Sequence, residues 1–258
     1  MSSRQRARRS RRRSSASEDF AELTLRAGEA LREYPRGLGR DPFRVEVRMA
    51  TPVAMAHPWI HLDGLISHLV FRDALGELFW LLPARQPLPL RIPLPLEETA
   101  GVWHGSVSEF SSTTWSTTTV YKRFPTRDVA VLNRGKTKRI NLASGRFRSW
   151  RITLPYTPTR SVVFHGCGDI EVIRELFRHV KHVGKKTAYG FGEIREVTIE
   201  QEDEDRSLVS DGVAMRPLPV RMLSLYDDKV MMACRPPYWA KESVEMCAPP
   251  RTVVEVVK

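Results

Sequence analysis

The most regular polar and apolar pattern in the chain is an alternation over residues 44–51. Val45, Val47 and Met49 alternate with charged neighbours. This period of two is typical of a half-buried strand, which turns one face to the core and the other to water. Pro52 and Pro58 interrupt the pattern because proline has no amide hydrogen for a sheet ladder. We therefore predict a first strand that ends before these prolines.

Two later segments have the period of an amphipathic helix. In the first, apolar residues fall at i, i+3, i+4, i+7 and i+8, namely Leu62, Leu65, Ile66, Leu69 and Val70. Asp63 near its start favours the helix dipole. The second helix presents Ile170, Ile173, Leu176, Phe177 and Val180 on one face. Asp169 is its predicted N-cap and Gly184 its predicted C-terminal stop.

The order of these elements predicts an α+β fold. Residues 83–95 are too rich in proline for a helix or a central strand, and residues 102–164 are rich in Thr, Ser, Val and aromatics. A last strand follows from Phe191 to Ile199 and ends in an acidic turn at residues 202–205. The predicted order is strand, helix, several strands, helix and strand. This order is the ferredoxin-like signature with an insertion between the middle strands.

The predicted organisation has five parts. Residues 1–18 form a disordered arginine-rich tail, and residues 19–100 the first part of a ferredoxin-like domain. Residues 101–160 form a β-rich basic insertion, and residues 161–201 the second part of the domain with a glycine-rich loop. Residues 202–258 have no clear helix and form a small C-terminal β appendage, because so few residues make a marginal domain.

The charge of the chain indicates a polyanionic partner. The net charge is +11 and the isoelectric point near 9.9. Seven arginines precede Glu18, and this tail adds affinity for phosphates or is a solvated extension. No apolar run has membrane-spanning length, and no apolar segment follows the N-terminal charges, so we expect neither a membrane span nor a secretory signal. Three scattered cysteines favour a reducing cytoplasm and indicate no paired-cysteine zinc site.

The segment 183–192, V-G-K-K-T-A-Y-G-F-G, is the first candidate binding site. Glycines permit a close approach of the main chain to a ligand, and two lysines supply positive charge at the same place. The alternative is a helix C-cap followed by a glycine-containing strand entry. The candidate ligand-binding residues here are Gly184, Lys185, Lys186, Tyr189, Gly190, Phe191 and Gly192.

A basic cluster in the insertion is the second candidate site. Its residues are Lys122, Arg123, Arg134, Lys136, Lys138 and Arg139, with aromatic residues interleaved. Such a ribbon can neutralise phosphates while aromatic rings stack on unpaired bases. The alternative is a solvated hairpin whose rings pack beneath it.

Catalytic signals are weak. His57, His61 and His68 lie close in sequence without an H-E-x-x-H pattern, so we expect no metal site and no cofactor. One of these histidines could act as a general base on an RNA 2′-hydroxyl. His179 and His182 suit a phosphate-facing helix end. No G-x-S-x-G elbow or complete phosphate-binding loop is present.

Taken together, several motifs resemble the RAMP superfamily of CRISPR proteins. These are H-P-W-I-H-L-D-G-L-I at 57–66 and V-G-K-K-T-A-Y-G-F-G-E-I at 183–194. The L-D-G-L-I helix start, R-P-P-Y-W at 235–239 and C-A-P-P at 247–250 most resemble the Csf three family, the Cas five-like subunits of type IV effector complexes. The resemblance covers roughly residues 43–250.

The resemblance implies a binding subunit without catalytic residues. Its body and β-hairpin thumb would grip the 5′ handle of the CRISPR RNA, cap a backbone filament and lie near the protospacer-adjacent motif of target DNA. Its partners would be CRISPR RNA, target DNA and other effector subunits (the backbone filament protein and a large or small subunit). The alternatives are a Cas six-like endoribonuclease that processes precursor RNA, and a general single-strand nucleic-acid binder.

Overall fold

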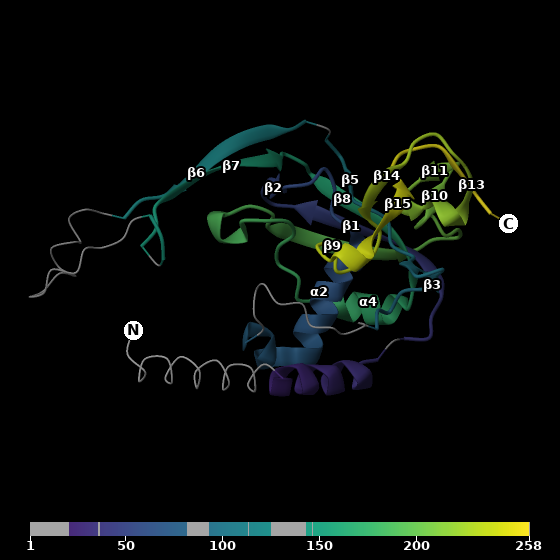
Figure 1. Ribbon diagram of the computed structural model, residues 1–258, viewed down its shortest axis with the longest axis horizontal. Coiled ribbons are helices and arrows are strands. Elements are labelled where there is room, and N and C mark those ends of the chain that lie inside the picture. Colours follow the sequence, from purple (N-terminus) through teal and green to yellow (C-terminus); the bar gives the residue numbers. More distant parts are fainter. Residues whose placement is uncertain are drawn as a thin grey trace, which may run out of the picture.

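The protein has a mixed α+β architecture of several antiparallel sheets and few helices. The computed structural model describes residues 21–35, 37–81, 93–112, 114–124, 143–145 and 147–257 (Figure 1). Among these residues, no helix is both long and apolar enough to cross a membrane.

The main sheet has four antiparallel strands in the order β5-β8-β1-β9. These strands are β1 (Asp41–Met49), β5 (Glu109–Phe110), β8 (Ser161–Gly168) and β9 (Ile194–Gln201). Val45, Val47 and Met49 are buried on β1, as the alternation predicts. The strand begins three residues before the predicted start, because Asp41 already pairs with Gly168.

Both predicted helices lie on one side of this sheet (Figure 1). The first is α2 (Leu62–Leu75), followed by a 3-10 turn, η1 (Gly76–Leu81). The second is α4 (Ile170–Phe177), where the Asp169 carboxylate accepts a hydrogen bond from the amide of Val172 at 3.2 Å. This contact confirms Asp169 as the N-cap. A further helical segment, residues 21–33, contributes the buried Ala27 and Leu31.

The predicted C-terminal stop of the second helix at Gly184 is wrong. The helix ends at Phe177, with Arg178 as its C-cap. The chain then becomes extended, because the amide of Ile194 donates to the carbonyl of Lys181 at 2.9 Å. Pairing with the start of β9 therefore takes the place of the last predicted helical turn.

A second sheet carries the stem of the basic insertion. Its order is β2-β7-β6, with β2 (Val53–Ala54), β6 (Ser116–Lys122) and β7 (Trp150–Thr157). Figure 1 shows β6 and β7 reaching away from the body of the protein. The tip of the predicted insertion, residues 125–142, lies outside the described residues. Two short strands, β3 (Glu98–Thr99) and β4 (Val102–Trp103), pair with each other.

The C-terminal region consists of short strands and 3-10 turns, without an α-helix in the described residues 202–257. It contains β10 (Val209–Ser210), β11 (Val213–Ala214), β12 (Leu218–Pro219), η3 (Val220–Met222), β13 (Leu223–Tyr226), β14 (Val230–Ala233), η4 (Lys241–Ser243), β15 (Val244–Ala248) and β16 (Val254–Val256). Ala214, Leu218, Leu223, Ala248 and Val254 form a small core of their own. This core is separate from the larger one between the main sheet and its helices.

Candidate nucleic-acid interface

The glycine-rich loop, residues 183–192, is anchored to the chain that follows β1. The amide of Val183 donates to the carbonyl of Gly192 at 2.8 Å, which closes the base of the loop. The amide of Gly192 donates to Pro52 at 2.8 Å, and that of Lys185 donates to Ala54 at 2.7 Å. Three backbone hydrogen bonds therefore hold the loop in place at the end of the main sheet.

Its glycines serve two different purposes. Gly184 and Gly192 have φ of +89° and +71° and lie against other backbone. A Cβ on Gly184 would be 2.8 Å from the carbonyl oxygen of Ala54, and one on Gly192 would collide with the carbonyl oxygen of Val183. Gly184 and Gly192 therefore let the loop backbone pack closely against the backbone of Ala54 and Val183. Gly190, at φ +84°, faces open space.

The two lysines of the loop have different surroundings. Lys186 adopts a left-handed conformation with φ 60°, which is uncommon for a residue with a side chain. Its Nζ lies 5.1 Å from the ring centroid of Trp150 and 5.8 Å from that of Tyr189. An ammonium over aromatic faces is attracted by their quadrupoles. The side chain of Lys185, in contrast, is exposed beside the groove described below.

The loop and the β6–β7 hairpin, which are far apart in sequence, meet through aromatic side chains. Trp150 and Tyr189 have ring centroids 6.3 Å apart in an edge-to-face arrangement, and Tyr156 and Phe191 lie 5.7 Å apart. Lys122 is the cross-strand partner of Trp150. The structure thus brings Lys122, Lys186 and Tyr189 to Trp150, and Phe191 to Tyr156 farther along β7.

The remaining basic residues of the second candidate cluster divide into two groups. Arg123 follows β6 and its guanidinium lies 5.4 Å from the ring centroid of Tyr121, at the outer end of the hairpin. Arg134, Lys136, Lys138 and Arg139 lie outside the described residues.

Beside the loop lies a groove of about 890 Å³. It is bounded by α2, by the connection between α4 and β9, and by the loop itself. Five histidines from two separate parts of the sequence line the groove, namely His57, His61, His68, His179 and His182. Three longer basic side chains also line it, those of Arg72, Lys181 and Lys185. None of the described residues that line the groove is acidic, so it suits an anion.

His61 is the most perturbed histidine in the groove. The indole Nε1 of Trp59 donates a hydrogen bond to its Nε2 at 3.2 Å, and its ring stacks on Tyr238 with a centroid distance of 3.7 Å. Burial, followed by the positive charges of Arg216 and His57, lowers the pKa of His61 to about 3. His61 is therefore neutral near pH 7 and its lone pair is already occupied.

His68 is perturbed in the same direction. Burial lowers the pKa of His68, and the nearby Arg72 lowers it further. Its ring meets the edge of Phe79 at a centroid distance of 5.3 Å. Among the described ring contacts, His61 lies against Tyr238 and His68 against Phe79, whereas none involves His57.

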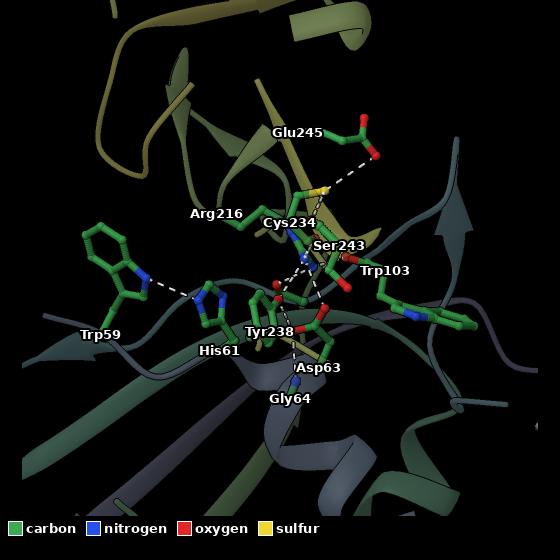
Figure 2. A network of polar contacts seen from close by, with 11 residues as sticks. Trp59, His61, Asp63, Gly64, Trp103, Arg216, Cys234, Tyr238, Ser243 and Glu245 are labelled. Atoms are coloured by element: carbon green, nitrogen blue, oxygen red, sulfur yellow. Dashed lines mark hydrogen bonds and ion pairs between the residues drawn. The ribbon is translucent and has the colours of Figure 1, made fainter. Parts of the chain in front are cut away.

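Beneath the groove, the C-terminal region is attached to α2 by a buried polar network that the sequence does not reveal (Figure 2). The side chains of Arg216 and Asp63 have no exposed surface, and their Nη2 and Oδ2 atoms are 2.9 Å apart. The hydroxyl of Tyr238 donates to Asp63 Oδ1 at 2.7 Å. Tyr238 therefore links the buried ion pair to the groove, where it stacks on His61.

The guanidinium of Arg216 also binds backbone carbonyls on both sides of this junction. It donates to Gly105 at 2.9 Å, to Cys234 at 2.6 Å and to Trp103. Burial has the largest single influence on the pKa of Arg216 and lowers it, but the Asp63 carboxylate, Tyr238 and Cys234 together raise this pKa above its ordinary value. Asp63 lies in the first helical turn as predicted, but its main contact is the ion pair with Arg216, which joins α2 to the C-terminal region.

Comparison with known proteins identifies the family. No curated protein matches the chain. The sequence model of one family, described as CRISPR type IV associated protein Csf3, matches residues 107–250, which is more than half of the chain. The match includes the glycine-rich loop, the β6–β7 hairpin, Arg216 and Tyr238. The chain belongs to the Csf3 family of type IV CRISPR-associated proteins.

Proposed function

We propose that this protein is a non-catalytic, RNA-binding subunit that holds the 5′ handle of the CRISPR RNA. Membership of the Csf3 family makes it a subunit of a type IV CRISPR effector complex. The single observation that carries the RNA-binding proposal is the meeting of loop and hairpin at Trp150, Lys186 and Tyr189, next to a basic groove.

The topology of the main sheet supports a ferredoxin-like RAMP body. Strand β1 is followed by α2 and β5, and β8 is followed by α4 and β9. In each of these units the two strands are separated by one strand of the other unit, in the order β5-β8-β1-β9. Two interlocked split β-α-β units are what the ferredoxin-like arrangement requires. The glycine-rich loop then lies at the end of the sheet, between its second helix and its last strand.

The chemistry of the interface suits single-stranded RNA. Lys181 and Lys185 at the groove supply mobile positive charge for phosphates, and Arg72 supplies a fixed fork of donors. The exposed Tyr189 offers a ring on which an unpaired base can stack. RNA handles are bound in this way because side chains cannot enter the narrow major groove of an RNA duplex.

In the complete complex, the proposed interface also involves other subunits and target DNA. In the proposal, the basic residues between Arg134 and Arg139 form a thumb between the guide and an adjacent subunit, and the protein caps one end of the backbone filament near the protospacer-adjacent motif of target DNA. Base pairing with the guide supplies sequence recognition, and the protein supplies shape and charge.

The environment of His61 argues against this residue as the general base of the endoribonuclease alternative. A general base needs a free lone pair and a pKa near the working pH. His61 accepts a hydrogen bond from Trp59, and burial lowers its pKa to about 3. His57, His68, His179 and His182 are exposed, and they carry what remains of the enzymatic alternative.

One experiment separates the three functions. Purified protein is incubated without metal ions with its own repeat RNA and with a shuffled RNA of the same composition. The proposal predicts tighter binding of the repeat RNA and no cleavage. Products that end in a cyclic phosphate, lost in a His57→Gln variant, would establish the endoribonuclease. Equal affinity for both RNAs would establish a general single-strand binder.

A further inference from the structure

A second cluster of reactive side chains lies at the other end of the main sheet. Glu97, His104 and Cys167 each offer one ligand atom, and these atoms all lie within 4.8 Å of one another. Cys167 is near the end of β8, where Pro42 at the start of β1 is its cross-strand partner. The glycine-rich loop instead contacts the chain beyond the end of β1. The cluster is therefore separate from the proposed RNA interface.

Backbone hydrogen bonds hold the three residues in a closed ring. The amide of Glu97 donates to the carbonyl of Cys167 at 2.8 Å. The amide of Cys167 donates to His104 at 3.1 Å, and the amide of His104 donates back to Glu97 at 2.8 Å. Each residue thus fixes the position of the other two before any ligand arrives, which lowers the entropic cost of binding one.

The surroundings of His104 select one tautomer of its ring. Nδ1 lies 2.6 Å from Oδ2 of Asp205, and a carboxylate can only accept, so Nδ1 carries the hydrogen. Nε2 then has a lone pair, which accepts a hydrogen bond from the hydroxyl of Thr99 at 2.8 Å, and a metal ion at Nε2 would replace this hydrogen bond. A histidine that ligates a metal usually donates its other ring hydrogen to a carboxylate in this way.

Cys167 completes a set of mixed ligands. Its thiol is nearly buried, 3.4 Å from Oε2 of Glu97 and 3.3 Å from the carbonyl of Arg40. Sulfur and imidazole ligands select a borderline metal such as zinc over magnesium or calcium. A thiolate and a carboxylate together carry two negative charges, which match one divalent cation.

We propose that Cys167, His104 and Glu97 bind one Zn²⁺ ion, with Asp205 orienting His104 and a water in the fourth position. On coordination, the thiol of Cys167 releases its proton to solvent. The ion links β8 to the segment that holds Glu97 and His104, and through Asp205 to the turn after β9. Scattered ligands of this kind do not form a sequence motif, because Glu97 and Cys167 are 70 residues apart.

The test uses the full-length protein, stripped with a chelator and titrated with Zn²⁺ or Co²⁺. We expect one equivalent of bound metal, a higher thermal unfolding temperature with zinc, and a thiolate-to-cobalt charge-transfer band in the absorption spectrum. Cys167→Ser should abolish this band. Cys234→Ser and Cys247→Ser, which alter the two other buried cysteines, should retain it. Asp205→Asn should weaken zinc binding roughly tenfold to a hundredfold.

Three results would overturn the proposal: no stoichiometric binding by the unaltered protein, a charge-transfer band that survives Cys167→Ser, or a band lost only with Cys234 or Cys247. If Cys167→Ser does not fold, Glu97→Gln tests the same site from its more exposed side and should weaken binding. A Lys185→Ala, Lys186→Ala variant should bind zinc normally, so the zinc site and the RNA interface can fail independently.

Discussion

The Nη2 atom of Arg216 lies 2.9 Å from Oδ2 of Asp63, and neither side chain has exposed surface. Arg216 follows β11 in the C-terminal region, and Asp63 lies in the first turn of α2, next to the groove-lining Gly64. Because Tyr238 bonds to Asp63 and stacks on His61, this ion pair positions a wall of the proposed RNA site.

Arg216→Met should destabilise the protein by about 3–5 kcal/mol, because it leaves the Asp63 carboxylate buried without a partner. Denaturant unfolding measures this loss. The control is Arg221→Ala, which removes a partly exposed ion pair with Glu245 and should cost less than about 1 kcal/mol. Similar losses in both variants would contradict a structural role for the buried pair.

Combined Lys185→Ala and Lys186→Ala should weaken binding of repeat RNA and lower the salt slope by roughly one to two phosphate equivalents. The measurement is the dissociation constant at several salt concentrations. Lys229→Ala with Arg206→Ala removes the same charge from exposed positions of the C-terminal region and should leave the slope nearly unchanged. An equal change in both variants would indicate a general charge effect.

Gly192→Ala should disrupt the loop more than Gly190→Ala does. Both positions have positive φ, which costs a residue with a side chain roughly 1–2 kcal/mol. Only at Gly192 would the new Cβ also collide with the carbonyl of Val183, whereas Gly190 faces open space. Thermal unfolding and RNA affinity should both separate the two variants. Equal effects would show that the close contact at Gly192 is unimportant.

The low pKa of His61 should make stability depend on pH. The pKa is about 3 in the folded protein, against an ordinary value of 6.5, so protons favour the unfolded chain. The free energy of unfolding that the neutral His61 contributes is fully present above pH 6.5 and is lost as the pH falls toward 3. Linkage gives a loss of about 2 kcal/mol at pH 5.

His61→Gln, which cannot be protonated but can still accept from Trp59, should flatten this part of the pH profile. Its control is His57→Gln, which changes an exposed histidine of the same groove. Denaturant unfolding between pH 7 and pH 5 compares the three proteins. Parallel profiles for His61→Gln and the unaltered protein would contradict the assigned shift.

Local sequence patterns were sufficient for the first strand and for the starts of the two core helices. The alternation of Val45, Val47 and Met49 and the helical spacing from Leu62 to Val70 predict the burial that the structure shows, because each pattern follows directly from the geometry of its own element. The N-cap at Asp169 is equally local. The family resemblance is also carried by short motifs, and the match to Csf3 confirms it.

Contacts between distant segments were decided only by the tertiary structure. The acidic turn at residues 202–205 is visible in the sequence. The sequence does not show, however, that Glu202 binds the buried His165 at 2.7 Å or that Asp205 binds His104. In the same way, nothing near Trp150 in sequence indicates its contact with Lys186 and Tyr189. Such contacts depend on strand register and chain crossing, which patterns of a few residues do not encode. The sequence by itself therefore determined the first strand and the starts of the two core helices, and the tertiary structure decided where the second helix ends and which side chains form a site.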